Sequence, residues 1–301
     1  MKTTGARRKK SARRYQNAAA ASTEDDVSTS SIPSPSLPFS IQRLDGRTAF
    51  VTGASAGIGA ACAGHLAALG ANVVLGARRQ ERLDAVKASI VARVPGARVF
   101  AAAVDVTDAA AVDAWLAAGS TALGDCDILV DNAGLALGRA HAADLVDADV
   151  DTMFDVNVRA AIRLVQRVLP GMKQRAAAGR PGDLVLMASI AGTEPYAGGS
   201  IYCATKAAVQ AFARSVRAEL LGTDIRVLTI DPGLVETEFS IVRNRGDVAA
   251  ANATYKGLEA LTADDVADTV AFALTRPRRM SLDRVQVLAS AQLGTQSFFR
   301  S

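Results

Sequence analysis

Short apolar segments alternate with longer amphipathic ones from Arg47 to the end of this 301-residue chain. The apolar segments read TAFVTG, NVVLGAR, ARVFAAAVD, DILVDNAG, DLVLMAS, IRVLTIDPG and DRVQVLA. Strands that are apolar throughout are expected where helices cover both faces of a parallel sheet. Between them, apolar spacing predicts helices over 58–69, 81–94, 108–118, 150–172, 200–221 and 263–274. We therefore predict an α/β fold, a single doubly wound domain with a mainly parallel seven-stranded sheet flanked by helices.

The first 40 residues differ in composition from the rest. They run from a basic cluster, ARRKKSARR, through alanines to a Ser/Pro-rich stretch with few large apolar side chains. Such a segment cannot bury enough apolar surface to offset the entropy of ordering, so we predict a disordered extension over residues 1–40 and one domain over residues 41–301. A tail without a specific partner, nuclear import and mitochondrial targeting are alternative roles for it. The basic start is typical of a transit peptide, whereas the acidic residues 24–26 are not.

Charge and composition exclude several classes of function. The formal net charge of +4 lies in the extension, whose seven Lys and Arg face three acids, so the domain is neutral and gives no reason to expect nucleic acid or membrane partners. Three cysteines and two histidines without a C-x-x-C pair argue against a metal site or a disulfide framework. No segment has the roughly 18 apolar residues of a membrane span. We expect a cytoplasmic protein.

A glycine-rich turn, TGASAGIG, connects the first predicted strand to the first helix. Glycine permits tight turning and close backbone approach, and the free amides at a helix start attract pyrophosphate. The spacing departs from the usual G-x-G-x-x-G, and glycines also occur in any cramped loop. Placement between strand and helix nevertheless favours a dinucleotide site of the Rossmann type. The residues assigned to it are Gly53, Ser55, Gly57, Ile58 and Gly59.

The ends of the next three strands predict how the cofactor is held. After the second strand stand Arg78 and Arg79 instead of an acid, which favours the 2'-phosphate of NADP, although two arginines could also be a solvated helix start. We expect Asp105 and Val106, after the third strand, to contact the adenine. The small residues that close the fourth strand would let the cofactor ribose approach the backbone: Asn132, Ala133 and Gly134.

Four polar residues downstream predict proton transfer. Tyr202 and Lys206 stand four apart in a helical segment and project from one face, so the ammonium can favour the phenolate. Ser189 ends the fifth strand, where its hydroxyl can bind a substrate oxygen beside Tyr202. Asn157, flanked by apolar residues within a predicted helix, would hold a water in a proton relay. Each residue alone is ordinary, but their order after a dinucleotide turn indicates an alcohol dehydrogenase.

These motifs resemble the classical short-chain dehydrogenase/reductase family across residues 45–290. TGASAGIG, DNAG, the Asn157 helix, Ser189, YCATK and DPG followed by Thr237 match its pattern in order. Within it, SIYCATKAAVQAF, GLVETEFSIVRNRGD and YKGLEALTADDVAD are most similar to NADP-dependent 3-hydroxy acid dehydrogenases, also called serine 3-dehydrogenases. The resemblance implies oxidation of serine, allo-threonine or small 3-hydroxy acids, NADP as cofactor and a homotetramer.

The resemblance also implies roles for individual residues. Tyr202 would be the catalytic acid/base, and Lys206 would lower its pKa and bind the nicotinamide ribose. Ser189 would steady the substrate oxygen, and Asn157 would complete the proton relay. The nicotinamide amide would be held by the turn after the sixth strand and the residues that follow it: Pro232, Gly233, Val235 and Thr237.

A substrate carboxylate needs a fixed cation, and Arg243 is our candidate to clamp it or to organise the loop that does. Arg243 and Arg245 could equally face solvent or pair with acids of another subunit. Two further functions stay open. One is a short-chain carbonyl reductase of aldehydes, ketones, steroids or quinones, and the other is a non-catalytic NADPH-binding scaffold.

Overall fold

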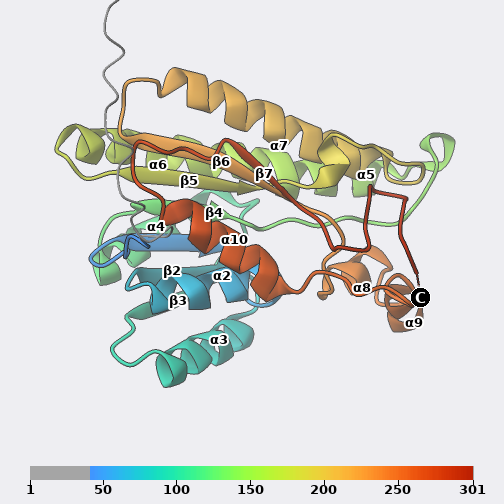
Figure 1. Ribbon diagram of the computed structural model, residues 1–301, viewed down its shortest axis with the longest axis horizontal. Helices are drawn as coiled ribbons and strands as arrows, with labels where there is room; N and C mark the ends of the chain where they lie inside the picture. Colours follow the sequence, from blue (N-terminus) through green and yellow to red (C-terminus); the bar gives the residue numbers. More distant parts are fainter. Residues whose placement is uncertain (1–40, 301) are drawn as a thin grey trace, which may run out of the picture. The chain divides into compact units, whose positions relative to one another are not determined.

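The computed structural model describes residues 41–300, and the extension predicted for residues 1–40 lies outside them. The described residues form one seven-stranded sheet in the order β3-β2-β1-β4-β5-β6-β7, and every neighbouring pair is parallel (Figure 1). The predicted doubly wound fold is confirmed. The strands are β1 (Thr48–Thr52), β2 (Asn72–Ala77), β3 (Val99–Ala103), β4 (Ile128–Asp131), β5 (Gly182–Met187), β6 (Ile225–Pro232) and β7 (Arg284–Val287).

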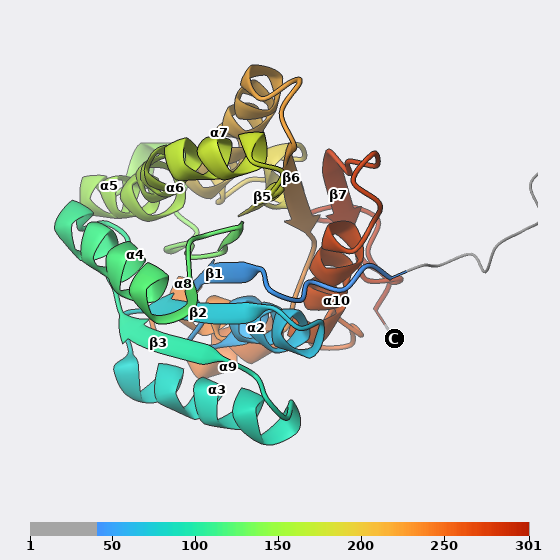
Figure 2. The same ribbon diagram turned by 90° about the vertical axis from the view of Figure 1, so that its left-hand side faces the viewer.

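Helices cover both faces of the sheet (Figure 2). One face carries α2 (Gly57–Ala68), α3 (Gln80–Arg93) and α10 (Ala263–Leu274), and the other carries α4 (Ala109–Leu123), α6 (Ala160–Ala177) and α7 (Ser200–Glu219). Successive strand residues alternate between these layers: Ala49 and Val51 pack toward α2, whereas Phe50 packs toward α4 with its ring against Trp115. Because both layers are apolar, the central strands carry no exposed polar face, whereas the edge strand β7 exposes Arg284 and Gln286.

Helix boundaries differ from the prediction in several places, and α4 ends at Leu123 where the prediction ended at 118. The helix expected over 150–172 is three segments: α5 (Asp147–Phe154), a π-helical turn η2 (Asp155–Arg159) and α6. The short helices α8 (Phe239–Arg243) and α9 (Val248–Ala253) were not predicted, because five or six residues are too few to show a helical period. They lie together beyond the carboxyl end of the sheet (Figure 1). Two 3₁₀ turns complete the elements, η1 (Ala142–Asp144) and η3 (Ile190–Gly192).

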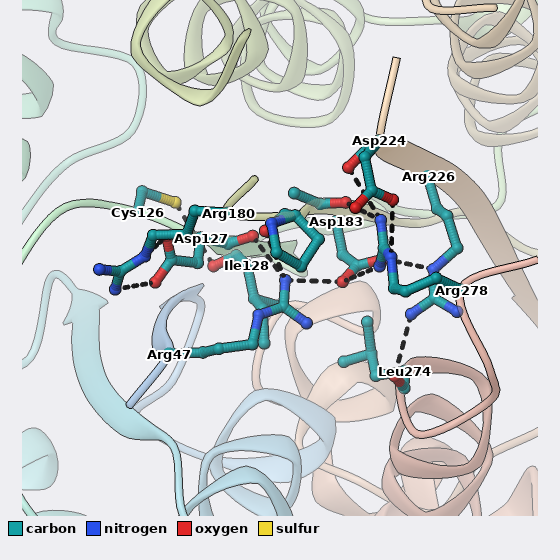
Figure 3. A network of polar contacts seen from close by, with 12 residues as sticks. Arg47, Cys126, Asp127, Ile128, Arg180, Asp183, Asp224, Arg226, Leu274 and Arg278 are labelled. Carbon is teal, nitrogen blue, oxygen red and sulfur yellow. Dashed lines mark hydrogen bonds and ion pairs between the residues drawn. The ribbon is translucent and has the colours of Figure 1, made fainter. Parts of the chain in front are cut away.

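A buried ionic network ties the amino ends of the strands (Figure 3). Asp183, at the start of β5, has no exposed surface and forms ion pairs with three arginines: Arg226 at 2.6 Å, Arg47 at 2.7 Å and Arg278 at 2.9 Å. Since these arginines come from β6, the segment before β1 and the segment after α10, one carboxylate joins four parts of the chain.

Between residues 41 and 300, no helix combines the length and the apolar character that crossing a membrane requires. The same residues contain no group of three or more His, Cys, Asp or Glu side chains placed to hold a metal ion.

Candidate active site

One cleft of about 820 Å³ lies at the carboxyl ends of the strands. It is lined by the glycine-rich turn after β1 and by the loops after β2, β3, β4, β5 and β6. The structure brings all the predicted site residues to this cleft except Gly59 and Asn157, which lie behind its wall. Residues spread over about 190 positions of sequence therefore share one site.

The glycines of the turn are required by geometry. Gly53 and Gly57 have φ of 63° and 54°, a region that side chains disfavour. A Cβ on Gly59 would stand 2.5 Å from the carbonyl oxygen of Gly53, so the first turn of α2 and the loop can approach this closely only without a side chain. The residue before α2, Ala56, gives no side-chain cap, which leaves the first amides of the helix available to an anion.

Thr52 was not predicted as a site residue, and its hydroxyl connects the start of this turn to the end of β4. Its buried hydroxyl donates to Asp131 and accepts from the amides of Asn132 and Ala133, each at 3.0 Å. The Asn132 side chain donates to the Thr52 carbonyl at 3.1 Å. Asn132 thus lines the cleft and ties the end of β4 to the start of the glycine-rich turn. A buried strand threonine carries no sequence signal that distinguishes it from a core residue.

Basic residues mark one end of the cleft. Arg79 donates to the Ser55 hydroxyl at 3.1 Å and pairs with Glu238 at 2.8 Å. Asp105 bonds the hydroxyl and amide of Thr107, which lower its pKa, and the charge of Arg78 lowers it further. The cations predicted for a 2'-phosphate and the acid predicted for adenine are therefore close neighbours.

Tyr202 and Lys206 project from α7 into the opposite end of the cleft. The Lys206 ammonium lies 5.8 Å from the centre of the Tyr202 ring and donates to the Met187 carbonyl at 2.8 Å. Burial lowers the pKa of Lys206 to about 8, against the raising effect of Asp131 and Asp231. Burial in turn raises the pKa of Asp131 to about 6.

Tyr202 is partly buried and lines the cleft, and burial raises the pKa of its phenol. Two groups oppose that effect, a hydrogen bond with Ser189 and the positive charge of Arg243. Ser189 is itself buried and holds the start of η3 by accepting from the amide of Ala191 at 3.1 Å. The cation that acts on the phenol in this structure is thus Arg243, and the influence predicted for Lys206 stays a prediction.

Asn157 lies in the π-helical turn η2 and is 2% exposed. Its side chain accepts from the amide of Leu135 and donates to the carbonyl of the same residue, both at 2.8 Å, and it donates to Thr205 at 3.1 Å. Because the Thr205 hydroxyl bonds the Tyr202 carbonyl, Asn157 ties the loop after β4 to the backbone of α7. π-helical turns often occur at functional sites because they redirect a side chain.

Arg243 does not face solvent: it is 8% exposed at the end of α8. Its guanidinium stacks over two rings, 5.3 Å from the centre of Tyr196 and 5.6 Å from that of Tyr202. The charge of Arg243 contributes to a lowered pKa at Arg139, after the larger effect of burial. Arg245, in contrast, is exposed and pairs with Asp149 of the same chain.

Tyr196 and Arg139 line the cleft and were missed from the sequence. Both stand in loops without motif or period, so only the fold reveals that they surround Arg243. The other wall is held by Gln292, whose side chain accepts from the amide of Leu234 at 2.9 Å. A Cβ on Gly233 would meet this side chain at 2.1 Å, which explains the glycine of the DPG turn.

The comparisons identify the family. The sequence pattern described as short chain dehydrogenase matches residues 47–247. The chain belongs to the short-chain dehydrogenase/reductase family, as its motifs predicted.

Three similar proteins illustrate the range of its relatives. An NADP-dependent 3-hydroxy acid dehydrogenase of Schizosaccharomyces pombe is 37% identical over 261 residues, which cover 86% of this chain and 99% of that protein. A sulfoacetaldehyde reductase of Chromohalobacter salexigens is 40% identical over 243 residues, 81% of this chain and 94% of that one. The closed form of a serine dehydrogenase complexed with NADP+ has a TM-score of 0.77 at 37% identity and covers 84% and 99% of the two chains.

Proposed function

We propose that this chain is an NADP-dependent oxidoreductase that transfers a hydride between the 3-hydroxyl carbon of a small 3-hydroxy acid and NADP. One observation carries the substrate class: the buried guanidinium of Arg243 stacks on the ring of Tyr202. A buried cation beside the acid/base needs a compensating anion, and a carboxylate two carbons from the reacting hydroxyl supplies it. Serine, allo-threonine and 3-hydroxypropionate have this form.

The residues of the cleft fit NADP. The closely packed glycines and the uncapped start of α2 suit a pyrophosphate, and Arg78 and Arg79 suit a 2'-phosphate. Asp105 and Val106 would hold the adenine, Lys206 the nicotinamide ribose, and the turn at Pro232 with Val235 and Thr237 the nicotinamide amide. Bound NADP would supply the hydride acceptor. The NADP named for two relatives supports this assignment.

In the proposed mechanism, Ser189 holds the substrate hydroxyl against Tyr202, and the ionised phenol takes its proton as the hydride leaves the same carbon. The product is a 3-oxo acid. Arg243 binds the substrate carboxylate and favours the phenolate. The ammonium of Lys206 passes the proton onward to a water that the Asn157 segment would hold. No oxyanion develops in the site, since proton and hydride leave together.

Steady-state rates test the substrate class. We expect NADPH formation from serine and 3-hydroxypropionate and little from a panel of lipophilic alcohols. A second candidate, reduction of aldehydes and ketones, is favoured by the 40% identity to a sulfoacetaldehyde reductase, since a sulfonate also suits Arg243. Turnover of apolar carbonyls alone would contradict the 3-hydroxy acid assignment, and turnover of sulfoacetaldehyde but not of serine would favour the second candidate.

Replacing Tyr202 with Phe tests the catalytic role. Y202F keeps the ring that packs against Phe239 but removes the hydroxyl proposed to take the proton, so we expect turnover to fall by roughly 10²- to 10⁴-fold. NADPH affinity, measured by fluorescence titration, should stay near the wild-type value. An unchanged rate would refute the assignment of Tyr202, and a wild-type protein that binds NADPH without any turnover would instead indicate a scaffold.

The assembly and location belong to the same proposal. We propose a cytoplasmic homotetramer whose catalytic domain spans residues 41–301 and whose residues 1–40 form an extension. Leu293 and Phe299 near the carboxyl end are 83% and 75% exposed, an apolar surface that another subunit would cover. Light scattering measures the mass of the assembly. A fluorescent fusion of residues 1–40 distinguishes a cytoplasmic location from nuclear or mitochondrial import.

A further inference from the structure

Glu238 connects two parts of the cleft that are far apart in sequence. It stands directly before α8, and its carboxylate pairs with Arg79 at 2.8 Å and with Arg82 at 3.6 Å. Arg79 is the residue before α3 and Arg82 lies in its first turn. Arg79 also donates to Ser55 at 3.1 Å, so its guanidinium is held between the glycine-rich turn and Glu238.

The pair with Glu238 engages one of the guanidinium nitrogens of Arg79 that a phosphate would use. The same guanidinium nitrogen, Nη2, donates to the carboxylate of Glu238 and to the hydroxyl of Ser55. A carboxylate and a phosphate each bind a guanidinium through their oxygens. The two anions are therefore alternative partners of Arg79. The side chains of Arg79 and Glu238 are 49% and 38% exposed, so the bond between them is weak enough for a phosphate dianion to displace.

Displacement does not remove the carboxylate from the neighbourhood. Glu238 and Ser55 line the same cleft, and the preceding residue, Thr237, lies against the glycine-rich turn: a Cβ on Gly57 would stand 3.3 Å from its methyl group. A carboxylate anchored this closely repels a second anion on the same arginines. NAD has a hydroxyl at the 2' position instead of a phosphate. This hydroxyl can donate a hydrogen bond to a carboxylate.

We propose that Glu238 selects between the two nicotinamide cofactors: it competes with the 2'-phosphate of NADP for Arg79 and thereby lowers the preference of the chain for NADP over NAD. The inference rests on the proposed use of NADP. Glu238 would thus take part in cofactor choice. It lies about 160 positions after the end of β2, where the sequence predicts the residues that choose the cofactor.

The test compares the dissociation constants of E238Q and wild type for four probes: NADP+, NAD+, 2',5'-ADP and 5'-AMP. Gln keeps the size of the side chain and removes its charge. We expect E238Q to bind NADP+ and 2',5'-ADP roughly 3- to 10-fold more tightly, the scale of an exposed ion pair with added repulsion. Binding of NAD+ and 5'-AMP should stay unchanged or weaken. E238A should show the same direction.

E236Q is the matched control, because it removes the same charge from an exposed side chain two residues away. It should leave all four constants unchanged. Weaker binding of NADP+ by E238Q would overturn the proposal and show that Glu238 holds the segment closed on the cofactor. Wild type that prefers NAD+ would overturn the proposed use of NADP, whereas wild type that prefers NADP+ with an unchanged E238Q would overturn only the role of Glu238.

Discussion

The buried charge of Arg243 acts on the phenol of Tyr202, and we propose that it also binds the substrate carboxylate. Its guanidinium is nearly removed from water and lies over the Tyr202 ring, where it favours the phenolate. One of its nitrogens, Nε, is buried without a hydrogen-bond partner among the described residues. A buried donor of this kind binds an acceptor strongly, since no water competes for it. If Arg243 also binds the substrate carboxylate, as proposed above, substrate binding and proton transfer are coupled through one residue.

We predict that R243A lowers kcat/KM for a 3-hydroxy acid by roughly 10- to 100-fold, the scale of one hydrogen bond to a charged group. The pH profile of oxidation should move as well. Because the charge of Arg243 lowers the pKa of Tyr202, its removal raises that pKa, and the rising limb of the rate moves to higher pH. Rates measured across pH with saturating NADP+ give both quantities.

R245A is the control for this variant. Arg245 is two residues away, is exposed and pairs with Asp149, so its loss should leave the constants and the pH profile unchanged. An R243A profile identical to that of the wild type would show that Arg243 has no influence on the phenol. If R243A left the KM for the 3-hydroxy acid unchanged, the proposed binding of the substrate carboxylate by Arg243 would be wrong.

At the scale of the element, the first turn of α2 determines how closely the chain can approach a pyrophosphate. We predict that G59A lowers NADP+ affinity and destabilises the fold by about 1–3 kcal/mol, because the added Cβ would stand 2.5 Å from the Gly53 carbonyl and push the turn away. Titration with NADP+ and thermal unfolding measure the two effects.

The same helix offers a matched control in Gly64. A Cβ there meets nothing within 4 Å, so G64A should raise the stability of α2 by about 0.5–1 kcal/mol and leave cofactor binding unchanged. Equal effects of the two substitutions would indicate that glycine content in general, and not the contact with Gly53, governs the turn.

Elements with a periodic apolar pattern were predictable from the sequence. Elements that depend on contacts between residues far apart in the sequence were not. All seven strands and the six long helical segments followed from apolar spacing, as α10 at its predicted bounds shows. The π-helical turn at Asn157 was not predicted, because the partners that favour it, Leu135 and Thr205, belong to other elements. Tyr196 and Glu238 were missed for the same reason, since their partners become neighbours only in the folded chain.

At the scale of the whole molecule, the two ends of the sheet have different tasks. The carboxyl ends carry loops, glycines and the cleft, whose backbone must stay open to a ligand. The amino ends are held by arginines that surround buried carboxylates. Asp127 pairs with Arg180 at 2.6 Å, and Asp183 pairs with the three arginines named above. We infer that stability is concentrated at the end that does no chemistry.

We predict that D183N destabilises the protein by about 3–5 kcal/mol, because it leaves Arg47, Arg226 and Arg278 facing a neutral amide in a buried site. The effect should appear in urea unfolding, while kcat/KM of the folded fraction stays at the wild-type value, since the network lies at the far end of the strands from the cleft. The control is D224N, which removes a partly exposed partner of Arg278 alone and should cost about 1 kcal/mol or less. If both variants unfolded alike, burial of the Asp183 charge would not be what holds the amino ends of β1, β5 and β6 together.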